Sequence, residues 1–371
     1  MKPRILFIMH MPPPVHGAAM MGKFIHDSKI VNDAFECRYI NPTTAESLED
    51  IGKIGLRKLR DFYSLLIRIR QNVKEFSPNL VYFTANACGG PFYKDFIIVE
   101  LLKRMGCRIV VHYHNKGVST RQDRCLDDCL YRHFFRGLKV ILLAEALYKD
   151  VQKYVKREDV QICPNGIPES IDYESRAKRN NAVPHILFLS NLIESKGVIV
   201  LLDALKILKD NGRNFVCNFV GGETAEIDES RFNDEVNKRD LGNFAIYNGK
   251  KFGEEKMAFY QEADMMVFPT YYHNECFPLV LLEAMQCGVA CISADEAAIP
   301  EMIDDGKTGL LIHKGVNGIP SSEDVSTAIE KLITNRQLCC QMGQKGRSKY
   351  KRMYTLSLFE QRITDCVKSC L

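Results

Sequence analysis

Short apolar runs alternate with longer amphipathic stretches along most of the chain. Runs that are apolar at nearly every position predict strands covered on both faces. They fall at residues 4–9, 80–84, 108–113, 139–143 and 160–163, and again at 186–190, 214–220, 244–247, 265–269, 290–293 and 309–312. Helical periodicity fills the gaps, notably over 56–76, 92–105, 198–211 and 279–287. Strands that alternate with helices predict α/β architecture with parallel sheets, and the pattern occurs twice.

A turn between the two halves marks the predicted domain boundary. The segment Pro164-Asn165-Gly166-Ile167-Pro168 interrupts regular structure, and a polar linker over residues 169–183 follows it. We therefore predict one domain over residues 1–168, a second over 184–350 and a terminal helical segment over 351–371. Open α/β sheets bind ligands at the carboxyl ends of their strands, so two such domains predict a ligand cleft where they face each other.

Composition excludes several classes of protein. The chain has 371 residues, of which 46% are hydrophobic and 26% charged, as in an ordinary globular protein. A net charge of +4, from 50 basic and 46 acidic side chains, gives no reason to expect nucleic acid as a partner. No apolar run approaches the roughly 18 residues of a membrane span, and the first residues do not form a signal peptide. We expect a cytoplasmic protein.

The 14 cysteines are too few for a disulfide scaffold, in which cysteine exceeds roughly 8% of residues, so reduced thiols are expected. Cys125, Cys129 and His133 recur every four residues and would share one helix face, which raises zinc binding as an alternative. The favoured interpretation is that these cysteines are small buried apolar residues, because no fourth ligand is evident. We assign no metal site.

The segment from Asn274 to Met285 carries the most informative motif. Pro278 suits the first turn of a helix, whose N–H groups, at Leu279 and Val280, would then point at an anion. Glu275 precedes this helix and Glu283 lies within it, so two carboxylates could bind hydroxyls on either side of that anion. A phosphate flanked by two polyols is a nucleotide sugar. The alternative is that both glutamates are ordinary solvated surface acids.

A second motif is the loop from Ser190 to Gly197, which leaves one predicted strand and opens a helix. Lys196 would lie at the carboxyl end of the strand, where an ammonium group can neutralise the charge that develops on a departing diphosphate. The alternative is a plain polar turn.

Together these residues resemble the retaining GT-B glycosyltransferases of glycosyltransferase family four. The hallmark of that family is a pair of glutamates with seven residues between them, as in Glu275 and Glu283. Further family positions recur in order, at Lys196-Gly197, Gly221-Gly222, Gly249, Ala263-Asp264, Pro269, Gly288, Pro300-Glu301, Asp305-Gly306 and Gly309. In the first half, the turn from Pro12 to Ala18 resembles the family's Gly-Gly loop, and Pro164-Asn165-Gly166 resembles its hinge signature.

The resemblance implies a GT-B fold, in which two Rossmann-like parallel-sheet domains face each other across a cleft. The first would bind the acceptor and the second the nucleotide-sugar donor, and residues 351–371 would cross back to the first; a plain helix on the second domain is the alternative. Glu275 would hold the hydroxyls of the sugar, Glu283 the ribose and Lys196 the diphosphate. Backbone groups of the segment Cys276-Phe277-Pro278-Leu279 would complete the donor site.

Two further positions follow from the resemblance. His114 matches a histidine that faces the sugar, although His112 points to the same face and stays a candidate, and a strand-end histidine bonded to backbone is the alternative. Gly17 would belong to the substrate loop, or else be a simple turn glycine. The sequence also departs from the family, with Asn191 in place of its usual arginine and His16-Gly17 in place of its Gly-Gly. One charge-assisted contact would be lost at Asn191, unless another cation replaces it.

The resemblance implies transfer of a hexosyl or N-acetylhexosaminyl group to a glycan or lipid-linked glycan in surface polysaccharide biosynthesis, with retention of anomeric configuration. Because Lys196 and a helix N-terminus can stabilise the leaving group and no Asp-x-Asp motif is present, we predict metal-independent catalysis without a cofactor. No protein general base is assigned. An epimerase or hydrolase of nucleotide sugars, or a non-catalytic subunit that binds them, are the alternatives.

A basic amphipathic helix is predicted between residues 53 and 74. Apolar positions alternate there with the cations Lys53, Arg57, Lys58, Arg60, Arg68, Arg70 and Lys74. Such a helix can lie on an anionic membrane, on its inner face, close to a lipid-linked acceptor. The alternative is a helix whose apolar stripe faces the core and whose basic face is solvated.

Overall fold

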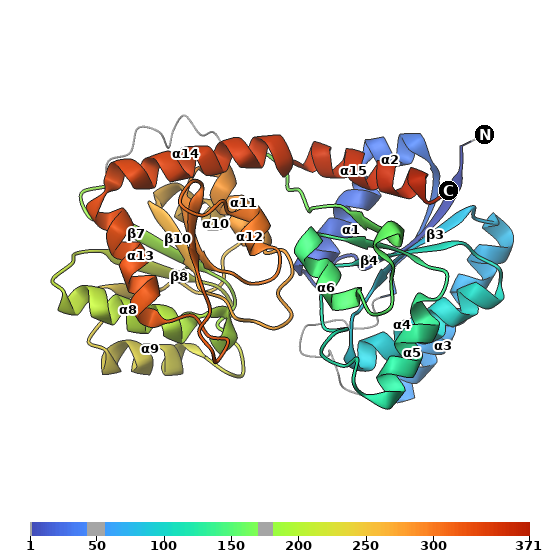
Figure 1. The fold of residues 1–371 in the computed structure, drawn as a ribbon, viewed down its shortest axis with the longest axis horizontal. Coiled ribbons are helices and arrows are strands. Elements are labelled where there is room, and N and C mark those ends of the chain that lie inside the picture. Colours follow the sequence, from blue (N-terminus) through green and yellow to red (C-terminus); the bar gives the residue numbers. More distant parts are fainter. Residues whose placement is uncertain (1, 43–55, 170–180) are drawn as a thin grey trace. The chain divides into compact units, whose positions relative to one another are not determined.

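The computed structural model describes residues 2–42, 56–169 and 181–371, and it contains two six-stranded parallel sheets with helices on their faces (Figure 1). The predicted fold class is therefore confirmed. Contacts within the chain define two compact units. Unit 1 comprises Met1–Gly166 and Leu356–Leu371, and unit 2 comprises Ile167–Thr355. Lys53 and Ile54 of the predicted basic helix, and residues 170–180 of the predicted linker, lie outside the described residues.

The sheet of unit 1 has the strand order β2-β1-β3-β4-β5-β6. Its strands are β1 (Arg4–Ile8), β2 (Glu36–Ile40), β3 (Leu80–Ala85), β4 (Ile109–Tyr113), β5 (Lys139–Leu142) and β6 (Val160–Ile162). Every residue of β3 and β4 is buried, as the continuous apolar runs predict. Strand β2 was not predicted from the sequence, because this edge strand buries only its last residue and includes Glu36 and Arg38.

Helices cover both faces of this sheet (Figure 1). They are α1 (Gly17–Asp27), α2 (Lys29–Ala34), α3 (Leu56–Phe76), α4 (Gly89–Arg104), α5 (Cys125–Phe135), α6 (Tyr148–Val151) and α15 (Leu356–Ser369), with short 3-10 turns η2 (Glu145–Leu147) and η3 (Arg157–Asp159). The terminal helix α15 contacts α1 and α2 on one face, while α3, α4 and α5 contact each other in succession on the other.

The sheet of unit 2 has the strand order β12-β11-β10-β7-β8-β9. Its strands are β7 (His185–Leu189), β8 (Val216–Val220), β9 (Ala245–Tyr247), β10 (Met265–Phe268), β11 (Ala290–Ala294) and β12 (Gly309–Ile312). Its helices are η4 (Glu194–Lys196), α8 (Val198–Asp210), α9 (Glu229–Lys238), α10 (Gly253–Glu262), α11 (Leu279–Gln286), α12 (Ile299–Met302), α13 (Ser322–Thr334) and α14 (Arg336–Met353).

The strand order of unit 2 creates a switch point beside β7. The chain adds β8 and β9 on one side of β7 and then β10, β11 and β12 on the other. The loops that follow β7 and β10 therefore leave the carboxyl edge in opposite directions, and open α/β sheets bind ligands in the crevice this leaves. The same reversal occurs in unit 1 between β1 and β3.

No helix in the described ranges combines the length and the apolar character that crossing a bilayer requires.

Candidate active site

Lys196 lies in η4, the short turn that follows β7 at the switch point of unit 2. Gly197 ends this turn with φ +92°, a left-handed conformation that favours glycine. A Cβ atom at Gly197 would lie 2.4 Å from the backbone oxygen of Pro269, so the loop passes directly over the end of β10. The N–H of Tyr271 donates to the Ser195 oxygen at 2.8 Å. Close backbone approach thus fixes the position from which the lysine extends.

The Lys196 and Glu275 side chains meet. Lys196 Nζ lies 2.5 Å from Glu275 Oε2, and the two side chains are only 15% and 10% exposed. The ammonium group also lies 4.3 Å from the centre of the Tyr272 ring, a cation–π contact. The Lys196 ammonium group and the Glu275 carboxylate neutralise each other where little water reaches them. Loss of either side chain would leave the other as an unpaired buried charge, which destabilises the fold.

Glu283 has its own partners. Lys256 Nζ lies 2.6 Å from Glu283 Oε1, and the Tyr260 hydroxyl donates to Oε2 at 2.8 Å. Lys256 and Tyr260 are one turn apart on α10, so they project from the same face toward α11. Burial, with the Glu283 carboxylate beside it, raises the pKa of Tyr260 well above its usual range, which keeps the phenol protonated and donating.

The start of α11 supplies backbone donors between these two carboxylates in sequence. Pro278 is the N-cap rather than the first helical residue, and Leu279 and Val280 open the helix. The N–H groups of these first helical residues have no carbonyl acceptor within the helix. Cys276, Phe277 and Pro278 are buried. The Cys276 oxygen accepts from the Ala298 N–H at 3.1 Å. Only the backbone of this segment is therefore suited to a ligand.

Asn191 holds the loops after β7 and β8 together. Its Oδ1 accepts from the Gly222 N–H at 3.2 Å, and the Leu192 N–H donates to the Gly222 oxygen at 2.8 Å. A Cβ atom built on Gly222 would lie 3.2 Å from Asn191 Oδ1 and 3.5 Å from Lys250 Cδ, so the Lys250 chain runs beside the amide. The predicted substrate role of Asn191 stays a prediction.

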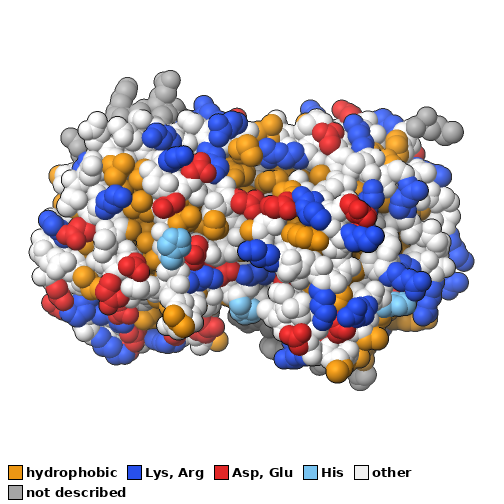
Figure 2. Space-filling model, in the orientation of Figure 1, with side chains coloured by type: hydrophobic (Ala, Val, Ile, Leu, Met, Phe, Trp, Pro, Cys, Tyr) orange, Lys and Arg blue, Asp and Glu red, His pale blue; other side chains and the backbone are white. Residues whose placement is uncertain are grey.

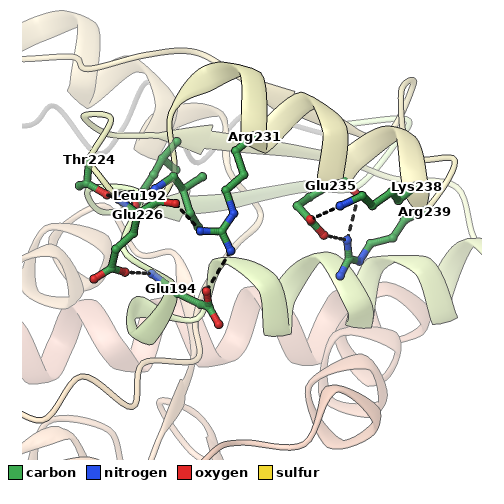
Figure 3. Close-up of polar contacts among 9 residues, drawn as sticks. Leu192, Glu194, Thr224, Glu226, Arg231, Glu235, Lys238 and Arg239 are labelled. Atoms are coloured by element: carbon green, nitrogen blue, oxygen red, sulfur yellow. Dashed lines mark hydrogen bonds and ion pairs between the residues drawn. The ribbon is translucent and has the colours of Figure 1, made fainter.

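A polar network extends this link to η4, as Figure 3 shows. The Thr224 hydroxyl donates to the Leu192 oxygen at 2.6 Å, and the Glu194 N–H donates to Glu226 Oε2 at 2.9 Å. Arg231 reaches from α9 to Glu194, with 3.1 Å between Nη2 and Oε2, and also donates to the Glu226 backbone oxygen. The turn that carries Lys196 is thereby held on the β8 side as well as the β10 side.

Unit 1 carries the other predicted residues, at the carboxyl edge of its own sheet. Gly17 is the first residue of α1, and His16 caps this helix by accepting from the Ala19 N–H at 3.3 Å through Nδ1. This bond requires that Nδ1 of His16 be unprotonated. Burial lowers the pKa of His16, which favours that state.

His114 directly follows β4, and neither of its ring nitrogens has a hydrogen-bond partner among the described residues. Burial, with His10 and His16 nearby, lowers the pKa of His114 to about 3. Its neighbour His112 is fully buried, and the Tyr82 hydroxyl contacts His112 Nδ1 at 2.5 Å. Of the two candidates, His114 is therefore the one whose two ring nitrogens are both buried without a hydrogen-bond partner, and its imidazole is neutral near pH 7.

The structure thus brings Lys196 and Glu275 into contact in unit 2, whereas Glu283 lies on α11 and contacts Lys256 and Tyr260 instead. Gly17 and His114 lie in unit 1, at the start of α1 and directly after β4. Four partners of the unit 2 residues and of the Lys196 turn were not predicted from the sequence, namely Lys256, Tyr260, Tyr272 and Arg231. The four-residue spacing of Lys256 and Tyr260 puts them on one helix face, but nothing local indicates that this face meets Glu283.

The alternative zinc site is not supported. Cys125 and Cys129 are exposed on α5, so the favoured interpretation that they are buried apolar residues is wrong as well. His133 Nε2 lies 2.8 Å from Glu100 Oε2. Within the ranges described, no three His, Cys, Asp or Glu side chains are grouped so that they could hold a metal ion.

Residues 172–349 match the family model described as glycosyl transferases group 1. Residues 172–349, which make up most of unit 2, belong to this family. The chain is similar to amylovoran biosynthesis glycosyltransferase AmsK of Erwinia amylovora, with 29% identity over 286 residues, covering 75% of the chain and 67% of the relative. It is also similar to lipopolysaccharide 1,2-N-acetylglucosaminetransferase of Salmonella typhimurium, with 25% identity over 278 residues, covering 71% and 67%. Two further relatives are matched over only 40% and 62% of their length.

Solved structures agree with this family assignment at the level of the fold. Anabaena Alr3699/HepE in complex with UDP has a TM-score of 0.74 and 16% sequence identity, with 100% of each chain covered. The predicted resemblance to group 1 glycosyltransferases and the GT-B fold class are both confirmed.

Proposed function

We propose that this group 1 glycosyltransferase moves a sugar from a nucleoside-diphosphate sugar to a hydroxyl of a glycan or lipid-linked glycan, with retention of configuration. The observation that carries the proposal is the Lys196–Glu275 pair, at the switch point of unit 2 and on the segment that opens α11. An ammonium, free helix N–H groups and a carboxylate in one place suit a diphosphate joined to a polyol.

Donor binding would exchange partners at this pair. The diphosphate replaces Glu275 as the counter-charge of Lys196, and the released carboxylate accepts hydrogen bonds from hydroxyls of the donor sugar. Glu283, held by Lys256 and Tyr260, binds the ribose hydroxyls. After the exchange the Lys196 ammonium group is paired with the diphosphate and the Glu275 carboxylate is hydrogen-bonded to hydroxyls, so the cost of opening the ion pair is offset by the contacts that replace it.

The chemical step breaks the bond between the anomeric carbon and a phosphate oxygen. Positive charge grows on the sugar while negative charge grows on the diphosphate, where Lys196 and the amides of Leu279 and Val280 stabilise it. The acceptor oxygen bonds to the anomeric carbon from the same face, and its proton passes to the departing phosphate oxygen. The residues of this chain thus act mainly on the leaving group, and His114 holds a sugar hydroxyl as a neutral imidazole.

Lys250 is a candidate for the cation that the family has at Asn191. Its side chain runs beside the Asn191 amide at Gly222, and it is exposed at the carboxyl edge of unit 2. From there an ammonium group could reach the phosphates in place of the arginine.

The names of the relatives indicate which substrates to test first. Alr3699/HepE was solved with UDP, AmsK is named for amylovoran biosynthesis, and the Salmonella relative is named for N-acetylglucosamine transfer to lipopolysaccharide. We therefore propose a UDP-hexose or UDP-N-acetylhexosamine donor and a surface polysaccharide or lipopolysaccharide precursor as acceptor, without a metal cofactor.

Product analysis tests this proposal. The full chain is incubated with UDP-glucose, UDP-galactose or UDP-N-acetylglucosamine, with and without a panel of glycoside acceptors, in buffer containing EDTA. Mass spectrometry should find an acceptor enlarged by one sugar, with UDP released in equal amount. Release of free sugar at the same rate without acceptor would identify a hydrolase, a changed donor sugar would identify an epimerase, and UDP binding with no turnover of any nucleotide sugar would identify a binding subunit.

A further inference from the structure

Helix α3 leaves a stripe of large apolar side chains in solvent. Leu59, Tyr63 and Ile67 are 59%, 67% and 42% exposed. They are spaced four residues apart, so they lie along one side of the helix over more than two turns. Single exposed apolar residues are common, but a row of three on one helix indicates an interaction surface.

This stripe is separate from the face that α3 buries. Leu65, Ile69, Val73 and Phe76 are buried, and they form the side that packs in unit 1. The alternative drawn from the sequence, a core-facing stripe with a solvated polar face, therefore describes only part of this helix. The solvent side of α3 is itself partly apolar.

The charges around the exposed stripe are basic. At 3.6 residues per turn, Arg70 and Lys74 fall on the same side as the stripe, and Arg60 borders it. Arg60 has 80% of its side chain exposed, and its Nε lies 3.8 Å from Asp61, a long contact in solvent. The acids Asp61 and Glu75 fall on other sides of the helix. The face thus combines apolar side chains with Arg60, Arg70 and Lys74.

The neighbouring helix α4 has the same character. It contacts α3, and it exposes Ile97 together with Lys94 and Arg104. We refer to the exposed residues Leu59, Arg60, Tyr63, Ile67, Arg70 and Lys74 of α3, with Lys94, Ile97 and Arg104 of α4, as the α3–α4 face.

The charge of the chain is divided unevenly between its units. Unit 1 has 28 Lys and Arg against 19 Asp and Glu, whereas unit 2 has 22 against 27. The net charge of +4 therefore conceals a strongly basic unit 1 and an acidic unit 2. Figure 2 shows Lys and Arg side chains spread over unit 1, the right-hand part of that view. A charge asymmetry of this kind indicates an anionic partner for the basic unit.

We propose that the α3–α4 face docks on the surface of an anionic lipid bilayer. Tyr63, Ile67, Leu59 and Ile97 insert at the boundary between headgroups and acyl chains, and the surrounding cations contact anionic headgroups. A second copy of the chain is a poorer occupant, because symmetric pairing would bring like charges together. The proposal does not depend on the transferase activity, although docking would bring the protein to a lipid-linked acceptor.

Vesicle flotation with the full chain tests this proposal. The protein should float with vesicles that contain phosphatidylglycerol and stay behind with pure phosphatidylcholine, and raised salt should reduce the floating fraction. Two double variants remove parts of the face, Tyr63→Ser/Ile67→Ser its apolar side chains and Arg60→Glu/Arg70→Glu its cations. Each should lower the floating fraction at least 5-fold, because the loss of one cation or one apolar group weakens membrane affinity roughly 5-fold.

Matched controls lie in unit 2, at Ile246→Ser for an exposed apolar side chain and Lys345→Glu for an exposed cation. Both should float as the parent does. Absence of flotation, equal flotation of the α3 variants and the parent, or a concentration-dependent dimer that the same α3 variants abolish would each overturn the proposal. Transfer to a water-soluble acceptor, measured on the same variants, should be unchanged, which separates failure of docking from failure of the proposed function.

Discussion

Lys196 and Glu275 are 79 residues apart in the chain, and their charged atoms lie 2.5 Å apart at the switch point of unit 2. Two backbone constraints bring them together. The left-handed Gly197 lets the loop after β7 pass over Pro269, and the loop after β10 leads from there to Glu275. The backbone of these two loops therefore fixes where both side chains start, before any donor binds.

Lys196→Ala tests the role assigned to the ammonium group. We expect turnover to fall roughly 10²- to 10³-fold, about 3 to 4 kcal/mol of transition-state stabilisation, because the charge that develops on the diphosphate loses its ammonium partner at this position. Steady-state rates with saturating acceptor measure the effect. Lys206→Ala, which removes a surface lysine paired with Asp210 on α8, is the control and should retain the parent rate. A folded Lys196→Ala protein with an unchanged rate would refute the assignment.

Gly197→Ala tests the close approach of the two loops. The substitution puts a side chain at φ +92° and a methyl group 2.4 Å from the Pro269 oxygen, so we expect a loss of about 3 kcal/mol in the free energy of unfolding. Gly212→Ala, at φ +72° with no atom within 4 Å, carries the backbone strain alone and should cost about 1 kcal/mol. Urea unfolding compares the two. Equal losses would mean that the contact with Pro269 is unimportant.

Tyr260→Phe tests the support of Glu283. The ring stays buried, but Glu283 Oε2 loses the hydroxyl 2.8 Å away. We expect donor Kd and KM to rise about 3- to 10-fold, on the order of 1 kcal/mol, with kcat unchanged, because the ribose is held in the ground state and the transition state alike. Tyr148→Phe removes a similar hydroxyl bond, to Val155 in unit 1, and serves as the control. A fall in kcat with constant KM would contradict the role given to Glu283.

Unit 1 should lose stability on acidification. The folded pKa is about 4 for His10 and about 3 for His114, against 6.5 in the unfolded chain. Below pH 6.5 the unfolded state therefore binds more protons, and stability falls as pH falls. Asp95 acts in the opposite direction, since burial raises its pKa to about 7 and the folded state then holds the extra proton.

Burial also lowers the pKa values of His16 and His112, which act in the same direction as His10 and His114. With these imidazoles against one carboxyl, we expect a net loss of at least about 2 kcal/mol between pH 7 and pH 5. Urea midpoints by circular dichroism measure it, and amide exchange in β3 and β4 assigns it to unit 1. His114→Gln should flatten the dependence and Asp95→Asn should steepen it. A midpoint that stays constant or rises on acidification would be inconsistent with buried neutral imidazoles.

The parts of the fold that could be predicted are those that a short stretch of sequence determines by its own pattern of apolar and polar residues. Strands such as β3 and β4 are apolar throughout because they are covered on both faces, and the sequence shows this directly. The edge strand β2 has a polar start and was missed. Lys196, Glu275 and Glu283 were predicted from motif spacing and the family resemblance, and their contact with a donor stays a prediction.

What the sequence could not reveal is which distant side chains meet. Glu283 is held by Lys256, 27 residues away, and the turn with Lys196 is held by Arg231 on α9. Such pairs depend on how helices lie on the sheet, and a single sequence carries no signal for that. The exposed stripe on α3 was hidden for a similar reason, because periodicity identified an amphipathic helix without telling which apolar residues the core would take.

Calorimetric titration of nucleoside diphosphates tests most directly whether Lys196 holds a diphosphate. UDP, GDP and ADP are titrated into the parent chain, and the tightest ligand is compared with its own nucleoside on the parent and on Lys196→Ala. We predict that the diphosphate binds at least 10-fold more tightly than the nucleoside, and that Lys196→Ala removes most of this advantage while nucleoside binding stays the same, as expected for loss of a charge-assisted contact of roughly 1.5 to 3 kcal/mol. Equal diphosphate affinity of the parent and the variant would contradict the account.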